Sequence, residues 1–150
     1  KLTLKDRQRD YLDADDQSTA DSLSSLRTNL SRNVEALTAA GLRVIIMLTP
    51  PEFPYEIHRC ILTKPAAQCG VSRQRYEQYR AAVSAVIREV AAGRSAVRVV
   101  DPASYFCTAT ECPAFVETNP ASYDDDHASA SAARAYAKVL SADFDWLLQR

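Results

Sequence analysis

Apolar residues recur at helical spacing in three stretches of the chain. The first runs from about residue 18 to residue 40, and Gly41 follows where a C-terminal cap belongs. The second begins after Ser72, a capping residue type, and ends near residue 92. The third covers about residues 129–149. Each of the first two stretches predicts a helix with one apolar face. In the first helix this face is formed by Leu23, Leu26, Leu30, Val34 and Leu37. In the second it is formed by Tyr76, Tyr79, Val83, Val86, Ile87 and Val90.

Two short apolar, β-branched runs lie between these helices. Residues 42–49 stop at Pro50-Pro51, and residues 97–100 stop at Asp101-Pro102. Such runs predict buried strands of a parallel sheet. The order helix, strand, helix, strand, helix predicts an α/β fold with βαβ units packed as a three-layer α/β/α sandwich.

The start of the chain carries weaker signals. Residues 1–5 alternate like a short strand, and residues 1–17 together form a polar lead-in. The length of 150 residues suits one domain, so we expect residues 1–150 to form a single domain.

The composition excludes several functions. A formal net charge of −1 argues against a nucleic-acid partner. The longest apolar run, residues 44–48, is far shorter than a membrane span requires. Only three glycines occur, which leaves no glycine-rich phosphate loop. We expect no bound cofactor and no metal.

The four cysteines form two local pairs, C-x8-C and C-x4-C, in proline-rich and polar stretches. They are Cys60, Cys69, Cys107 and Cys112, and the sequence alone does not choose among their connectivities. Local disulfides would each stabilise the fold by about 2–3 kcal/mol and would imply an oxidising compartment. Four free thiols are the alternative. A zinc site is disfavoured, because the spacing is not CxxC and the only histidines are His58 and His127.

One cluster of functional groups is dense, namely Asp124-Asp125-Asp126-His127. Acid–base chemistry needs a histidine that titrates near the working pH and a carboxylate that fixes its tautomer. An Asp three residues before a His, just ahead of a helix, supplies both groups from one short loop. The alternatives are favourable interaction with the helix dipole, a solvated acidic loop or a loose cation site.

Ligands of parallel sheets bind beyond the carboxyl ends of the strands. Those ends are expected at residues 50–52, at Asp101-Pro102 and at the loop of His127, and both cysteine pairs lie in the same loops. Glu52 is expected near the substrate only because it follows the end of the first predicted strand. His58 is expected on the surface, while Trp146, Tyr76 and Tyr79 are expected to serve in packing.

Several blocks in order resemble the C-terminal half of an SGNH hydrolase-type domain, in particular the domain fused to bacterial membrane acyltransferase-3 proteins. They are residues 97–102, Cys107…Cys112-Pro113 and Tyr123-Asp124-Asp125-Asp126-His127-Ala128-Ser129. The family's last block reads approximately Tyr-x-Asp-x-x-His-Leu-Ser. Residues 49–52 and the Cys60 and Cys69 segments also match, so the resemblance covers about residues 23–140. It implies an SGNH/flavodoxin-like sandwich with a parallel sheet, of which this chain is the C-terminal part, incomplete at its N-terminus.

The resemblance also implies roles for individual residues. His127 would be the general base that activates a serine, and Asp124 would orient it. Asp125 and Asp126 match no functional position of the family. The disulfides would be Cys60–Cys69 and Cys107–Cys112.

The chain departs from the family pattern at several places. It has no Gly-Asp-Ser block for the nucleophile, and the family's oxyanion-hole glycine and asparagine blocks are not recognisable. Ala128 stands where leucine is usual, and Ala132 where glycine is usual. The nucleophilic serine is therefore expected outside this chain, and the isolated chain is expected to be inactive.

The activity that the resemblance implies is O-acyl transfer, with acetyl as the expected group, to hydroxyls of a cell-surface glycan. The implied partners are the glycan acceptor, an acyl donor, a membrane acyltransferase domain in the same polypeptide, and either the N-terminal rest of the SGNH domain or an oligomeric partner. The implied location is the periplasmic side of the bacterial inner membrane. The alternatives are an SGNH esterase or deacetylase, and a non-catalytic glycan-binding or scaffold module.

Overall fold

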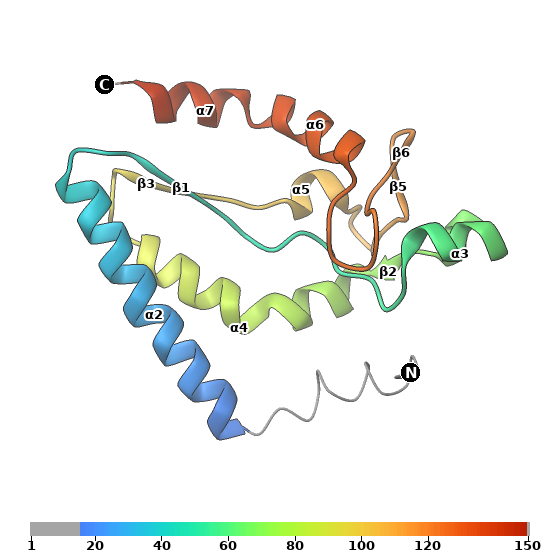
Figure 1. Cartoon of the computed structure of the whole chain (residues 1–150), viewed down its shortest axis with the longest axis horizontal. Helices are drawn as coiled ribbons and strands as arrows, with labels where there is room; N and C mark the ends of the chain where they lie inside the picture. The colour runs from blue at the N-terminus through green and yellow to red at the C-terminus, as the bar shows by residue number, and fades with distance from the viewer. Residues whose placement is uncertain (1–15, 150) are drawn as a thin grey trace.

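The computed structural model describes residues 16–149 of the chain (Figure 1). The alternating residues 1–5 therefore lie outside the described residues, as does most of the polar lead-in over residues 1–17. Its last two positions already belong to the first described helix, which begins at Asp16.

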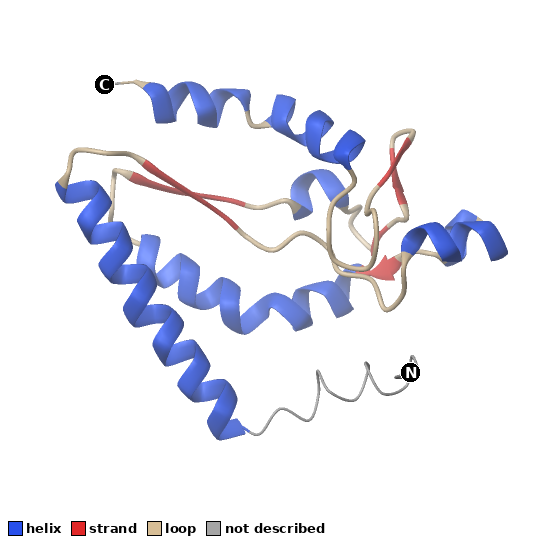
Figure 2. Ribbon diagram, in the orientation of Figure 1, coloured by secondary structure: helices blue, strands red, loops and turns tan. Residues whose placement is uncertain are grey.

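The described residues form a mixed α/β fold (Figure 2). Its helices are α2 (Asp16–Ala39), α3 (Ile57–Thr63), α4 (Arg73–Ala91), α5 (Ala103–Phe106), α6 (Ala130–Val139) and α7 (Ser141–Leu148), with a 3₁₀ turn at Ala66–Gln68. Its strands are β1 (Val44–Met47), β2 (Val71–Ser72), β3 (Val97–Val100), β4 (Glu111–Cys112), β5 (Phe115–Val116) and β6 (Asn119–Pro120).

The two predicted strands pair with each other in parallel. Val44 of β1 lies opposite Val97 of β3, and Met47 lies opposite Val100. Strand β3 has the predicted bounds, whereas β1 is shorter than the predicted 42–49 and only partly buried, with Met47 49% exposed. Among residues 16–149, β1 pairs with β3 alone. The α/β class and the parallel pairing are confirmed.

Helices lie on both sides of this strand pair (Figure 1). Because side chains alternate along a strand, Val44, Ile46 and Val97 pack with α2 and α4, whose buried residues there are Val34, Val86 and Val90. Ile45 and Val100 belong to the second apolar cluster, which contains Tyr136 and Leu140 of α6 and its C-terminal end.

The ends of α2 and α4 follow the predicted signals. The hydroxyl of Ser72 accepts a hydrogen bond from the backbone N–H of Arg75, which caps α4. Gly41 and Gly93 adopt left-handed backbone conformations, with φ of 77° and 72°, just beyond the two helices. The predicted apolar faces are only partly correct, because Leu37, Tyr79 and Val83 are 36–44% exposed.

The single helix predicted over residues 129–149 is wrong, because the chain turns at Leu140. Leu140 is buried, and its carbonyl accepts hydrogen bonds from Asp143 and Phe144 that start α7. The change of direction lets Trp146 of α7 pack under two guanidinium groups, with Arg98 at 4.3 Å and Arg43 at 5.2 Å from the ring centroid.

The long segments between β1 and α4 and between β3 and α6 contain the disulfides Cys60–Cys69 and Cys107–Cys112, in the predicted local pairing. They also contain short elements that periodicity does not predict, namely α3, α5, and the strand pairs β2·β4 and β5·β6. The β2·β4 pair joins the two loops, since Val71 lies opposite Cys112. Gly70 allows this approach, because a Cβ there would lie 3.0 Å from the carbonyl oxygen of Cys112.

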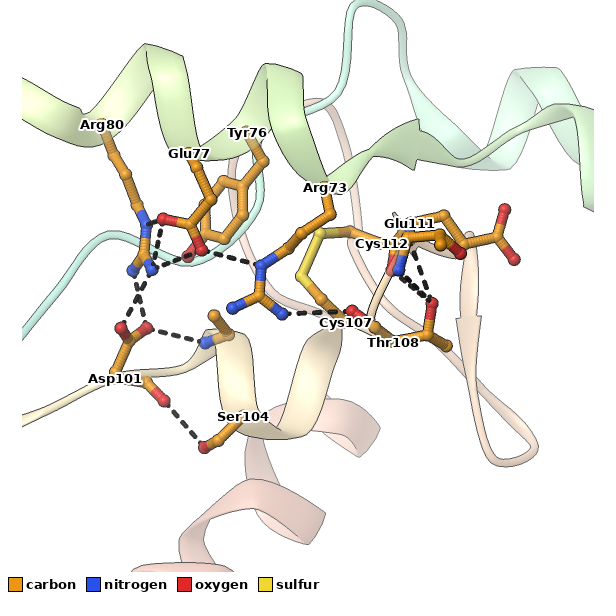
Figure 3. A network of polar contacts seen from close by, with 12 residues as sticks. Arg73, Tyr76, Glu77, Arg80, Asp101, Ser104, Cys107, Thr108, Glu111 and Cys112 are labelled. Atoms are coloured by element: carbon orange, nitrogen blue, oxygen red, sulfur yellow. Dashed lines mark hydrogen bonds and ion pairs between the residues drawn. A yellow bond between two sulfur atoms is a disulfide. The ribbon is translucent and has the colours of Figure 1, made fainter.

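A buried ion-pair network fixes the carboxyl end of β3 against α4 (Figure 3). Arg80 is 4% exposed and donates to both carboxylate oxygens of Asp101, at 2.6 and 2.9 Å. Arg80 also contacts Glu77 and lies over the ring of Tyr76. Burial alone would raise the pKa of Asp101, but hydrogen bonds from Arg80 and from the Ala103 N–H outweigh it and lower the pKa.

Replacing Arg80 with methionine should lower the free energy of unfolding by about 3 kcal/mol, because a partly buried carboxylate loses its bidentate partner. Arg88→Met is the matched control. Arg88 donates to the same carboxylate from the surface, at 2.9 Å with 54% of its side chain exposed, and should cost less than about 1 kcal/mol. Denaturant unfolding followed by circular dichroism measures both losses. Equal losses in the two variants would contradict the role of the buried pair.

Candidate functional site

The acidic loop ahead of α6 closes on itself. Ser122 and Ala128 form an isolated antiparallel bridge, and the Tyr123 N–H donates to the His127 carbonyl at 2.8 Å. The buried Ser122 hydroxyl donates to the same carbonyl at 2.6 Å. Ser129 then caps α6 by accepting from the Ala132 N–H. We call residues 123–127 the acidic loop.

Two backbone hydrogen bonds attach the acidic loop to the segment that follows β1. The Phe53 N–H donates to the Asp125 carbonyl at 2.7 Å, and the Ile57 N–H donates to the Asp124 carbonyl at 3.1 Å. Phe53 is 6% exposed and Ile57 is fully buried. The expectation that the His127 loop lies beside residues 50–52 is thus met, although the two are some 70 residues apart in sequence.

Asp124 and His127 contact each other directly. Oδ2 of Asp124 lies 2.9 Å from Nδ1 of His127. Oδ1 of Asp124 accepts the backbone N–H groups of His127 and Asp126, at 2.8 and 3.1 Å. The backbone bond from His127, aided by that from Asp126, lowers the pKa of Asp124 to about 2. The hydrogen bond and charge of Asp124 in turn raise the pKa of His127.

This geometry leaves Nε2 of His127 for chemistry. The hydrogen bonds found among residues 16–149 engage the ring at Nδ1, and the side chain is 76% exposed. An imidazole that donates from Nδ1 to a carboxylate carries its lone pair on Nε2 and can accept a proton there. The pair therefore has the arrangement of a general base and its orienting acid.

Asp126 also reaches the imidazole, which the sequence did not indicate. Its Oδ1 lies 2.7 Å from Nδ1 of His127. The residue directly before a histidine has no fixed side-chain relation to it, so only the tight closure of the loop brings the two together. Asp125 contributes its backbone carbonyl to Phe53, and its side chain raises the pKa of Glu52.

The surroundings of the loop are acidic and partly exposed. Burial raises the pKa of Glu52, a hydrogen bond from Tyr79 opposes this shift, and the charges of Asp126 and Asp125 add to it. Tyr79 thus contacts Glu52 rather than the core. His58 is exposed, as expected, and its Nδ1 lies 3.0 Å from the Tyr123 carbonyl.

Two other features of this edge have no assigned role. Asp124, Asp126 and His127 offer atoms within 4.8 Å of one another, but exposed acidic groups commonly cluster without a cation, so we assign no metal ligand here. Asp101, expected at the ligand edge, is engaged by Arg80 and Arg88.

An apolar hollow of about 170 Å³ lies beside the loop. It is bounded by Met47 at the end of β1, by Pro50 and Pro102 beyond the two strands, and by Ala128, Tyr136 and Phe144 of the C-terminal region.

Comparison with known proteins gives one match. A family model described as "SGNH domain (fused to AT3 domains)" matches residues 3–142. No curated protein and no solved structure matches the chain. Across residues 16–149, none of the helices has the length and apolar character that crossing a membrane requires.

The low pKa of Asp124 gives a direct test of the loop geometry. At about pH 3 its carboxyl group should remain mostly ionised, whereas an ordinary aspartate is mostly protonated there. The hydrogen bonds that depend on the carboxylate should be present above pH 4 and lost as the pH falls through about 2. A ¹³C NMR titration of the carboxyl groups, with amide dispersion as the control for folding, measures this. A midpoint for Asp124 at the usual value in the folded chain would contradict the geometry.

Proposed function

The chain belongs to the SGNH domains that are fused to AT3 domains, and we propose from this membership that it takes part in O-acyl transfer to hydroxyls of a cell-surface glycan. Acetyl is the proposed acyl group. The family supports an acyl-modifying, hydrolase-like domain, and the contact between Asp124 and His127 supports the chemistry.

The observation that best supports this chemistry is the 2.9 Å contact between the Asp124 carboxylate and Nδ1 of His127, whose ring is exposed. In the proposed mechanism Nε2 takes the proton of a serine that lies outside this chain. The serine oxygen attacks the acyl carbonyl of the donor, and the imidazolium returns the proton to the leaving group. His127 then takes the proton of the glycan hydroxyl as that oxygen attacks the acyl-serine, and returns it to the serine. Asp124 stabilises the imidazolium in both halves.

Two observations support the proposed cellular setting. The fusion to AT3 domains suggests a membrane-protein parent with an acyltransferase domain in the same polypeptide. The disulfides Cys60–Cys69 and Cys107–Cys112 are typical of an oxidising compartment. Together they support a location on the periplasmic side of the bacterial inner membrane.

The proposed domain is a complete three-layer sandwich in which this chain supplies the C-terminal part. Among residues 16–149 no strand pairs with the second edge of β1, and this supports the proposal. Val44 and Leu48 donate their N–H groups to Ala96 and Val100 across the β1·β3 pair. Since alternate residues face opposite edges, the N–H groups of Ile45 and Met47 point to the other side. A further strand, from the rest of the domain or from an oligomeric partner, would pair there and cover the apolar hollow beside Met47.

Replacing His127 with alanine in the full-length protein should abolish acyl transfer and leave the melting temperature unchanged, because the side chain is exposed and acts through Nε2. Asp124→Asn should lose up to about 10⁴-fold of the turnover through misorientation of the imidazole. His58→Ala is the control, because it removes the other exposed histidine near the same loop. The assay follows acetyl from a labelled donor into the glycan.

Two results would contradict the proposal. Full acyl transfer by His127→Ala would exclude the role of the imidazole. Release of free acetate with no acetylated glycan would indicate an esterase instead.

Hydrogen exchange tests the free edge of β1. The amides of Ile45 and Met47 should exchange at least about tenfold more slowly when the further strand is present in the same protein than in the 150-residue chain. Val44 and Leu48 are internal controls, because they already donate to β3 and should be protected in both samples. Equal exchange of Ile45 and Met47 in the two samples would show that no strand pairs there.

A further inference from the structure

The imidazole of His127 has two carboxylates at one nitrogen atom. Nδ1 lies 2.7 Å from Oδ1 of Asp126 and 2.9 Å from Oδ2 of Asp124. Nδ1 is hydrogen-bonded to Asp124, and Asp126 lies within ion-pair distance of the same nitrogen. Each carboxylate favours the Nδ1–H tautomer that leaves Nε2 as the base.

The two carboxylates are held very differently. Asp124 is fixed by the backbone N–H groups of Asp126 and His127, and 29% of its side chain is exposed. Asp126 is 53% exposed, and the contact that places its carboxylate is the one to the imidazole. Asp124 is therefore a rigid partner and Asp126 an adaptable one.

The other charged groups around the loop do not compete for Nδ1. Glu52, from the segment after β1, interacts with Tyr79 and with the charges of Asp125 and Asp126. His58, on α3, contacts the Tyr123 carbonyl and Glu56. Both Asp124 and Asp126 raise the pKa of His127, with the hydrogen bond that Asp124 accepts from Nδ1 as the largest cause.

We propose that Asp126 is a second positioning residue, which shares the Nδ1–H of His127 with Asp124 and preserves part of the imidazole orientation when Asp124 is lost. The catalytic meaning of this role rests on the proposed function. In this role two carboxylates orient the same imidazole, and each preserves part of the orientation when the other is removed.

The first test is an NMR titration of the His127 imidazole in the chain, which needs no turnover. Asp126→Asn should lower the pKa of His127, and Asp124→Asn/Asp126→Asn should lower it further than either single substitution. Asp125→Asn is the matched control, because it removes the same charge from the neighbouring position without a contact to Nδ1. It should lower the pKa of His127 less than Asp126→Asn does. Equal pKa values in Asp126→Asn and Asp125→Asn would overturn the proposal.

The second test measures kcat/KM against pH in the full-length protein. A lower pKa keeps His127 in its basic form to lower pH, so Asp126→Asn should move the acid limb of the profile to lower pH. Asp124→Asn should retain at least about tenfold more kcat/KM than the double variant, because effects within one unit are not additive. A double variant no worse than Asp124→Asn would overturn the backup role. Loss of the proposed function itself would instead show as full acyl transfer by His127→Ala, whatever the NMR titration gives.

Discussion

Buried backbone N–H groups must find acceptors, and the geometry of the site depends on this constraint at two positions. Phe53 and Ile57 are buried beside the end of β1, and water cannot reach their amides. Their acceptors are the carbonyls of Asp125 and Asp124. The apolar side chains that anchor the segment after β1 therefore also determine where the acidic loop lies. The contact between Asp124 and His127 is thus held in place by the burial of residues that take no part in it.

The acidic residues at this edge divide into two groups with different partners. Asp101 pairs with Arg80 and Arg88, Glu77 pairs with Arg80 and Arg73, and these ion pairs join α4 to the end of β3. Asp124 and Asp126 of the acidic loop, by contrast, both contact the imidazole of His127, so their negative charge acts on that ring. The carboxylates that pair with buried Arg80 thus have a structural role, whereas those that contact the exposed imidazole of His127 affect its charge.

The sequence predicts what is local and periodic. The bounds of α2 and α4, the two parallel strands and the contact of Asp124 with His127 all follow from spacing over a few residues. Helix α3 could not be predicted in this way, because seven residues are too few to form a stable helix alone, and it is held by buried Ile57 and the Cys60–Cys69 link. The β2·β4 pair joins residues about 40 positions apart. The exposure of Tyr79 reflects its contact with Glu52, a tertiary contact that helical periodicity cannot anticipate.

The attachment of the acidic loop through its main chain has a consequence for protein engineering. Since the bonds to Phe53 and Ile57 use the carbonyls of Asp125 and Asp124, they do not depend on which side chains those positions carry. The loop can thus be treated as a cassette whose side chains are exchanged while its anchor points stay in place. Libraries at position 125 would vary the side chain beside Asp124 and His127 while the backbone bond to Phe53 stays in place.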